Sequence, residues 1–142
     1  MVQRTSFGDL NARILKARSS RNPQDLSLLA LDDNDWVREA VAANSAASED
    51  ILRRLASDRC ERVRKAVASN ENASPALLRR LSTDAEWTVR VEAAFNTSTP
   101  PDVLLRLASD PVDVIRSAAY THPFGPLELR AMDIMAALGG EG

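Results

Sequence analysis

Residues 37–44 carry the sequence VREAVAAN, and residues 63–70 carry the closely similar VRKAVASN. The same offset of 26 residues leads on to residues 89–96 and 115–122 without an insertion or a deletion. A period of this length is the sequence signature of a solenoid, in which each unit packs against its two neighbours. The stretch at 37–44 therefore predicts a stack of about four similar layers.

A second segment recurs with the same period, as ILRRLASD at residues 51–58, LLRRLSTD at 77–84 and VLLRLASD at 103–110. In the first copy, positions 51, 52, 55 and 56 are apolar, which forms one stripe along an α-helix. Capping residues precede the segment, and proline stands at the first helical position in three copies. The capping residues are Asn22, Ser48 and Ser74, and the prolines are Pro23, Pro75 and Pro101. Each unit is thus predicted to contain one clear α-helix.

The Val-Arg-x-Ala segment is shorter and ends at Asn or His, which predicts a brief α or 3₁₀ helix of about two turns. One unit alone buries too few aliphatic side chains to offset its loss of chain entropy, so its neighbours must supply the remaining burial. We predict a single domain over residues 1–142, with an N-terminal cap at 1–21, repeats at 22–125 and a C-terminal cap at 126–142. The N-terminal cap is expected to form a helix over residues 6–18 with Leu10 and Ile14 inward, and the C-terminal cap a helix over residues 126–138.

The shared consensus, V-R-x-A-V-A-x-N-x-x-[ST]-P-x-x-L-L-x-x-L-A-x-D, closely resembles the leucine-rich repeat variant family over about residues 22–125. The resemblance implies alternating α and 3₁₀ helices in a right-handed superhelix without β-strands. It implies no reaction and names no partner. A HEAT-like α-solenoid is the structural rival, but its units are usually longer, near 40 residues. The predicted fold is an all-α, right-handed solenoid of about four 26-residue repeats with capping helices.

Composition narrows the function. The net charge of −2 supplies no global field that attracts DNA or a membrane surface. No apolar run approaches the length of a membrane span, so we expect a soluble, cytoplasmic protein without a membrane partner. Cys60 is the sole cysteine, which excludes an intrachain disulfide and a cysteine-based metal cluster. With no glycine-rich phosphate loop and no nucleophile–base pair in the sequence, we expect no enzyme, no cofactor, no metal and no small-molecule substrate.

Polar residues also recur at the period, and a structural role is their plainer interpretation. Each aspartate is expected to accept hydrogen bonds at a corner or to cap the shorter helix, while an arginine lies across the stack. The asparagines and the histidine suit either a left-handed or a backbone-bonded corner. The three sets are Asp32, Asp58, Asp84 and Asp110; Arg38, Arg64, Arg90 and Arg116; and Asn44, Asn70, Asn96 and His122.

Positions that differ between the copies are the candidates for binding. In the third unit Trp87, Val91 and Phe95 are four residues apart, so a helix aligns them in one apolar row. Aromatic side chains of this kind are favoured in binding hot spots, and Arg62 and Lys65 lie beside the row in the preceding unit. We predict a non-catalytic scaffold that binds a partner protein or peptide here. The alternative, that the row only thickens the core, stays open.

A set of arginines offers a second hypothesis, a nucleic-acid-associated module. They are expected on the outer flank of successive α-helices, where a basic strip would contact phosphates. Glu49, Asp50 and Asp102 at the helix starts dilute the strip, so a solvated face is the plainer interpretation. A third hypothesis is self-association through the open ends of the stack. The arginines of the strip are Arg53, Arg54, Arg79, Arg80 and Arg106.

Overall fold

The structure is a computed structural model that describes residues 8–125. Within this range the chain forms α-helices and no β-strand. The helices are α1 (Leu10–Ser19), α2 (Pro23–Leu29), α3 (Asp35–Ala42), α4 (Glu49–Leu55), α5 (Glu61–Ser69), α6 (Pro75–Leu81), α7 (Trp87–Phe95), α8 (Pro101–Leu107) and α9 (Asp113–Thr121). The predicted all-α repeat architecture is confirmed for these residues.

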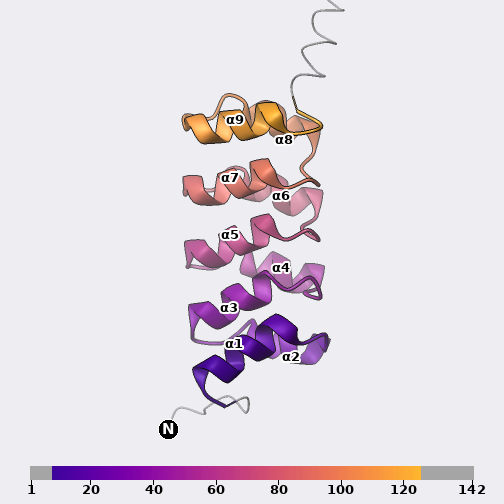
Figure 1. The fold of residues 1–142 in the computed structure, drawn as a ribbon, viewed down its shortest axis with the longest axis vertical. Coiled ribbons are helices and arrows are strands. Elements are labelled where there is room, and N and C mark those ends of the chain that lie inside the picture. The colour runs from indigo at the N-terminus through magenta and orange to yellow at the C-terminus, as the bar shows by residue number, and fades with distance from the viewer. Residues whose placement is uncertain (1–7, 126–142) are drawn as a thin grey trace, which may run out of the picture.

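The helices stand in two columns, which Figure 1 shows from the side. We call α2, α4, α6 and α8 the first column, and α1, α3, α5, α7 and α9 the second column. Successive helices of the second column contact one another directly, and each helix of the first column contacts the second-column helices next to it in the chain. Every layer therefore rests on the layer before it, as the nearest-neighbour logic of a solenoid requires.

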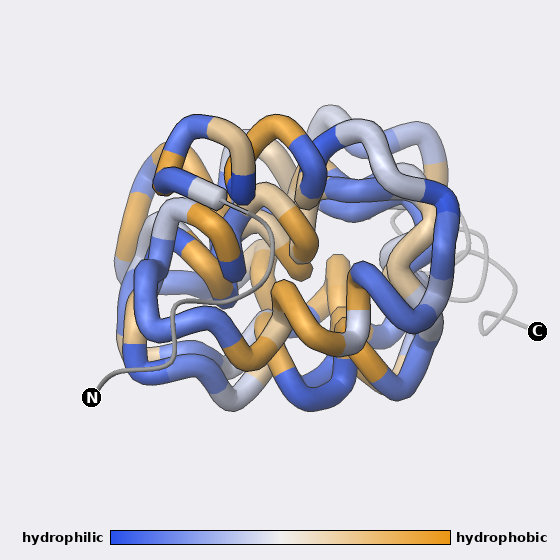
Figure 2. The backbone as a smooth tube through the Cα atoms, turned by 90° about the horizontal axis from the view of Figure 1, so that it is seen from below, coloured by the Kyte–Doolittle hydropathy of each residue, from blue (hydrophilic) through white to orange (hydrophobic). Residues whose placement is uncertain are grey.

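The apolar stripe predicted at residues 51, 52, 55 and 56 is buried, and its equivalents line the space between the columns. Figure 2 looks along the stack and shows that the repeats lie over one another in this direction. Two leucines from each first-column helix and at least one β-branched residue from each of α3, α5, α7 and α9 are almost fully buried. These are Leu26, Leu29, Leu52, Leu55, Leu78, Leu81, Leu104 and Leu107, with Val37, Val41, Val63, Val67, Val89 and Ile115.

The core is divided at α7 instead of running unbroken along the stack. Val89 belongs to a cluster that extends back to α1, whereas Val91 belongs to a second cluster that extends to α9. In α7 the third repeat carries Glu92 at the position where the other repeats carry a buried alanine. These alanines are Ala40, Ala66 and Ala118. A carboxylate in place of a methyl group interrupts apolar packing between layers, because its charge must stay solvated or paired.

The first-column helices begin as the sequence predicts. Asn22, Ser48 and Ser74 each accept a hydrogen bond from a backbone N–H of the first turn, and Pro23, Pro75 and Pro101 stand at the helix start. In the last repeat Pro100 replaces the capping residue, so α8 has no side-chain cap. Each helix then tightens at its end, where Ser57 N–H and Asp58 N–H donate to carbonyls three residues back in the second repeat.

The second-column helices are α-helical, so of the two alternatives open from the sequence the α form is correct. They span eight or nine residues in the repeats, against seven for the first column, so the prediction that they are the shorter helices is wrong. Each of them begins two residues before its Val-Arg or Ile-Arg pair, which lengthens the helix. The N-terminal helix α1 belongs to this column and begins at Leu10 after a cap by Asp9. Ala17 is its buried contact and Ile14 packs partly on the core, but Leu10 is 37% exposed, so its predicted inward position is wrong. The predicted C-terminal cap at 126–142 lies outside the described residues.

One corner of every layer is held by arginine and aspartate. Arg64 donates two hydrogen bonds to the carboxylate of Asp84 in the next repeat, at 2.8 and 3.1 Å, and one at 2.8 Å to the backbone carbonyl of Asp58 in its own repeat. Arg38 and Arg90 repeat this pattern on Asp58 and Asp110. We call this series the Arg–Asp ladder. It confirms the structural interpretation of both residue sets.

Both ends of the Arg–Asp ladder differ from its middle. At the start Arg13 of α1 forms an ion pair with Asp32 at 2.9 Å, so the first aspartate is also paired. At the other end Arg116 donates to the carbonyl of Asp110 and forms an ion pair with Asp113 on its own helix. The N-terminal helix therefore closes the ladder with an arginine that lies outside the repeat register.

Ionisation in the ladder follows from this geometry. The hydrogen bond to Asp84 is the largest effect that raises the pKa of Arg64. Burial alone would raise the pKa of Asp84, but the hydrogen bonds from Arg64 and from Glu86 N–H lower this pKa below its ordinary value of 3.8. Asp58 and Asp110 show the same direction for the same reasons. The charged form of each carboxylate is thus favoured by folding.

The opposite corner is held by buried asparagines, the Asn ladder. The amide of Asn70 donates to the carbonyls of Ala42 and Asn44 in the preceding repeat, at 2.7 and 3.1 Å, and its oxygen accepts from Asn72 N–H at 2.8 Å. Asn44 and Asn96 make equivalent bonds. Among residues 8–125 only glycine adopts a positive φ, so the backbone-bonded corner is correct and the left-handed alternative is wrong.

Candidate interaction surfaces

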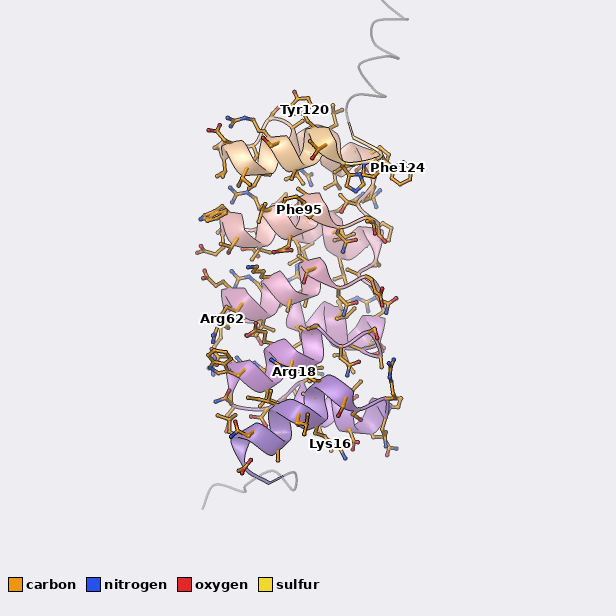
Figure 3. The ribbon with its side chains drawn as sticks, in the orientation of Figure 1. Lys16, Arg18, Arg62, Phe95, Tyr120 and Phe124 are labelled. Carbon is orange, nitrogen blue, oxygen red and sulfur yellow. The ribbon has the colours of Figure 1, made fainter. Side chains whose placement is uncertain are left out.

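The apolar row of the third repeat is split by burial. Trp87 and Phe95 of α7 are 49% and 57% exposed, whereas Val91 between them is only 8% exposed and packs in the second core cluster. Figure 3 shows Phe95 on the second column. The two aromatic side chains are therefore available to a partner. Val91 instead belongs to the core, as the alternative interpretation of the row expects.

An aromatic side chain also marks the first turn of α3. Trp36 is 53% exposed, and the guanidinium of Arg62 lies 4.3 Å from the centre of its ring. Arg62 also donates to the carboxylate of Asp35 at 2.7 Å, and this bond is the largest effect that lowers the pKa of Asp35. Figure 3 shows Arg62 at the edge of the stack, where the second-column helices begin. Trp36 and Arg62 thus join two adjacent repeats at this edge.

Lys65 is held by a weaker contact. Its ammonium group lies 3.7 Å from the carboxylate of Glu92 on α7, so α5 and α7 are linked across the face of the second column. Of the five predicted binding residues, Trp87, Phe95, Arg62 and Lys65 are accessible on adjacent helices of one column, and Val91 is not. Trp36 lies outside the predicted site, although it differs from its equivalents Arg62, Thr88 and Val114.

Most cations of the predicted arginine strip have partners within the first column. Arg53 forms an ion pair with Asp50 at 3.1 Å, and Arg79 forms one with Asp102 at 3.1 Å. Arg80 donates to the hydroxyl of Ser57, and Arg106 donates to the hydroxyl of Ser82. Such pairing within the protein reduces the charge available to phosphate groups. The nucleic-acid hypothesis for these arginines stays a prediction.

Arg54 departs from this pattern. Its guanidinium has neither a hydrogen bond nor an ion pair to any residue that the structure describes. Its equivalent Arg80 reaches Ser57, but the residue that corresponds to Ser57 below Arg54 is Leu31, which offers no acceptor. Arg54 lines a hollow of about 380 Å³ between α2 and α4, together with Leu28 and Leu31. This hollow was not predicted from the sequence, although a signal was present. Leu28 stands where the other repeats carry Arg, and Leu31 stands where they carry Ser or Thr.

The remaining chemistry-bearing groups are occupied by structural contacts. His122 extends the Asn ladder: its Nδ1 accepts from Phe124 N–H at 3.1 Å, so Nε2 carries the proton that is donated to the carbonyl of Asn96 at 2.9 Å. Cys60 is half-buried, and its thiol lies 3.4 Å from the carboxylate of Asp35. Within residues 8–125 no cluster of three or more metal-ligating side chains occurs, and no helix has the length and apolarity to cross a membrane.

Comparison with known proteins agrees with this geometry. The family model described as leucine rich repeat variant matches residues 61–86 and 87–112. The first match contains α5 and α6, and the second contains α7 and α8, so each covers one layer of the stack. Neither the curated proteins nor the solved structures contain a significant match to this chain. Residues 61–112 thus match two adjacent repeats of the leucine rich repeat variant family.

Proposed function

We propose that this protein is a non-catalytic interaction scaffold, and that a partner protein or peptide binds the accessible side chains of its second column. The observation that carries the proposal is the exposure of Trp36 on α3 and of Trp87 and Phe95 on α7, two helices of the same column. Large aromatic side chains provide much apolar contact area at a low entropic cost, which is why they are enriched at binding hot spots.

The divergence between repeats supports the same proposal. At the position of Trp87 the other repeats carry Asp35, Glu61 and Asp113, and at the position of Phe95 they carry Ala43, Ser69 and Thr121. The fold therefore does not require an aromatic residue at either position. Arg62 and Lys65 on α5 add positive charge beside the aromatic pair, but each is engaged with a carboxylate, so their contribution would lie at the rim of an interface.

The test exchanges the aromatic residues for those of the sibling repeats. The double variant Trp87→Glu, Phe95→Ser should lose capture of a specific partner from native lysate, because the apolar contact is gone, while circular dichroism shows an unchanged helical content. The matched control is Leu105→Arg, which makes the same kind of sibling exchange at an exposed apolar residue of the first column. Capture that survives the double variant, or that is lost equally with the control, would refute this surface.

A further inference from the structure

We propose that the hollow between α2 and α4 is a second docking site, and that it binds an amphipathic protein segment with aliphatic side chains and carboxylates. It lies on the first column, away from Trp87 and Phe95, so the inference does not rest on the proposed function above. We call it the α2–α4 groove, defined by Leu28, Leu31, Arg54 and Arg59.

The apolar part of the groove is a local exception to the repeat. Leu28 and Leu31 are 57% and 59% exposed, and they flank the same hollow. Their equivalents in the next repeat are Arg54 and Ser57, and in the one after Arg80 and Thr83. Leu28 and Leu31 therefore expose apolar surface to water at positions that are polar in the next two repeats. This exposure costs free energy, which a bound aliphatic side chain would recover by covering the leucines.

The charged part of the groove is positive. Of the charged side chains that line this hollow and the adjoining one, Asp32, Arg38, Asp50 and Asp58 are engaged in ion pairs. The side chains of Arg54, Arg59 and Asp33 have no ion pair or side-chain hydrogen bond to the described residues, which leaves one net positive charge. Arg59 is also unique to this repeat, because Asp33, Ala85 and Pro111 stand at the equivalent positions. A guanidinium without an acceptor beside apolar surface is suited to a carboxylate, which it binds in a bidentate manner.

The shape of the groove favours a protein segment over a free lipid chain. Leu28 and Leu31 are more than half exposed, so the groove is too open to enclose an alkyl chain on all sides. A helix that lays one apolar face along two leucines and one carboxylate against each arginine fits both features at once. The same argument disfavours a nucleic acid, whose backbone offers no aliphatic contact for the leucines.

The experiment uses the whole protein and a fluorescein-labelled synthetic peptide in which leucines recur every fourth residue between glutamates, followed by fluorescence anisotropy. We expect saturable binding that is weakened about tenfold by Arg54→Ser and by Leu31→Ser. Serine at position 31 matches Ser57 in the next repeat and gives Arg54 the hydroxyl acceptor that Arg80 has, so this variant should keep its fold. Arg80→Ser is the matched control and should leave the affinity within about twofold.

Several results would overturn the proposal. They are the absence of saturable binding at low salt, equal affinity for a peptide with glutamine in place of glutamate, and an Arg80→Ser effect as large as that of Arg54→Ser. Competition by a duplex oligonucleotide with the same dependence on Arg54 would assign the groove to nucleic acid instead. The variant Trp87→Glu, Phe95→Ser should bind the peptide as the unmodified protein does, so failure here is distinguishable from failure of the second-column surface.

Discussion

The two corners of each layer both join adjacent repeats through side-chain hydrogen bonds, but the side chains are charged at one corner and neutral at the other. At the Arg–Asp ladder a charged side chain reaches forward to the next repeat. The exposure of these pairs ranges from 8% and 9% for Arg38 and Asp58 to 17% and 10% for Arg64 and Asp84. At the Asn ladder a neutral amide reaches back to carbonyls of the preceding repeat and is almost fully buried. A neutral donor suits the buried corner because burial of a charge is costly, whereas the wetter corner tolerates an ion pair. The contrast predicts that the asparagines carry more stability and the ion pairs carry its pH dependence.

The largest effect is expected where the buried corner loses its donor. Asn70→Asp keeps the shape and the acceptor for Asn72 N–H but places a carboxylate against the carbonyls of Ala42 and Asn44. We expect a loss of about 3 kcal/mol in the free energy of unfolding, measured by urea denaturation, because a buried carboxylate then faces both carbonyls. The Ala42 carbonyl loses its donor, and the Asn44 carbonyl keeps only the hydrogen bond from Ala47 N–H.

Asn72→Asp is the matched control for this change. Asn72 also donates to a carbonyl of the preceding repeat, that of Ser45 at 2.6 Å, but at an exposed site. Water can replace the lost bond there, so we expect a loss below about 1 kcal/mol. Equal losses for the two variants would show that burial does not distinguish the corners.

An intermediate effect is expected at the charged corner, and it depends on pH. Folding lowers the pKa values of three carboxylates, those of Asp58, Asp84 and Asp110, below the ordinary value of 3.8. Their ionised forms therefore stabilise the fold at pH values above 3.8. This stability is lost as the pH falls through the folded-state pKa values. The melting temperature should therefore decline on acidification below about pH 4. Asp84→Asn should cost about 1–3 kcal/mol at neutral pH and flatten the acid decline. A decline of unchanged steepness in this variant would assign the acid sensitivity to other groups.

The smallest effect is expected where the Asn ladder ends in His122. Its single Nε2–H donates to the carbonyl of Asn96, whereas Asn70 and Asn96 each donate to two carbonyls. His122→Asn should restore the second donor and change the free energy of unfolding by no more than about 1 kcal/mol, towards greater stability. Thermal denaturation of this variant beside His122→Ala, which leaves the Asn96 carbonyl with only Thr99 N–H as a donor and should be less stable, would measure the difference. A less stable His122→Asn would mean that the contact between the His122 and Phe124 rings outweighs the second donor.

Much of the fold could be predicted because its determinants are periodic. The leucine stripe, the capping residues and the prolines act within one helix, so their spacing was sufficient to place the first column. The burial of Val91 could not be predicted in this way, since it stands four residues from both Trp87 and Phe95 and helical spacing treats the three alike. Which of them faces the core depends on the neighbouring repeats, and these differ in side-chain size at the contact.

The sequence by itself determined the period, the all-α architecture and the residue types at both corners, because these depend on local propensity and on chemistry that returns every 26 residues. Only the tertiary structure decided which partner each residue has. Arg64 takes the carboxylate of the next repeat and the backbone of its own, and Arg54 has no acceptor because Leu31 lies where Ser57 serves Arg80. Such pairings depend on which side chain of the adjacent layer lies within hydrogen-bond distance. The 26-residue period along the chain does not specify this.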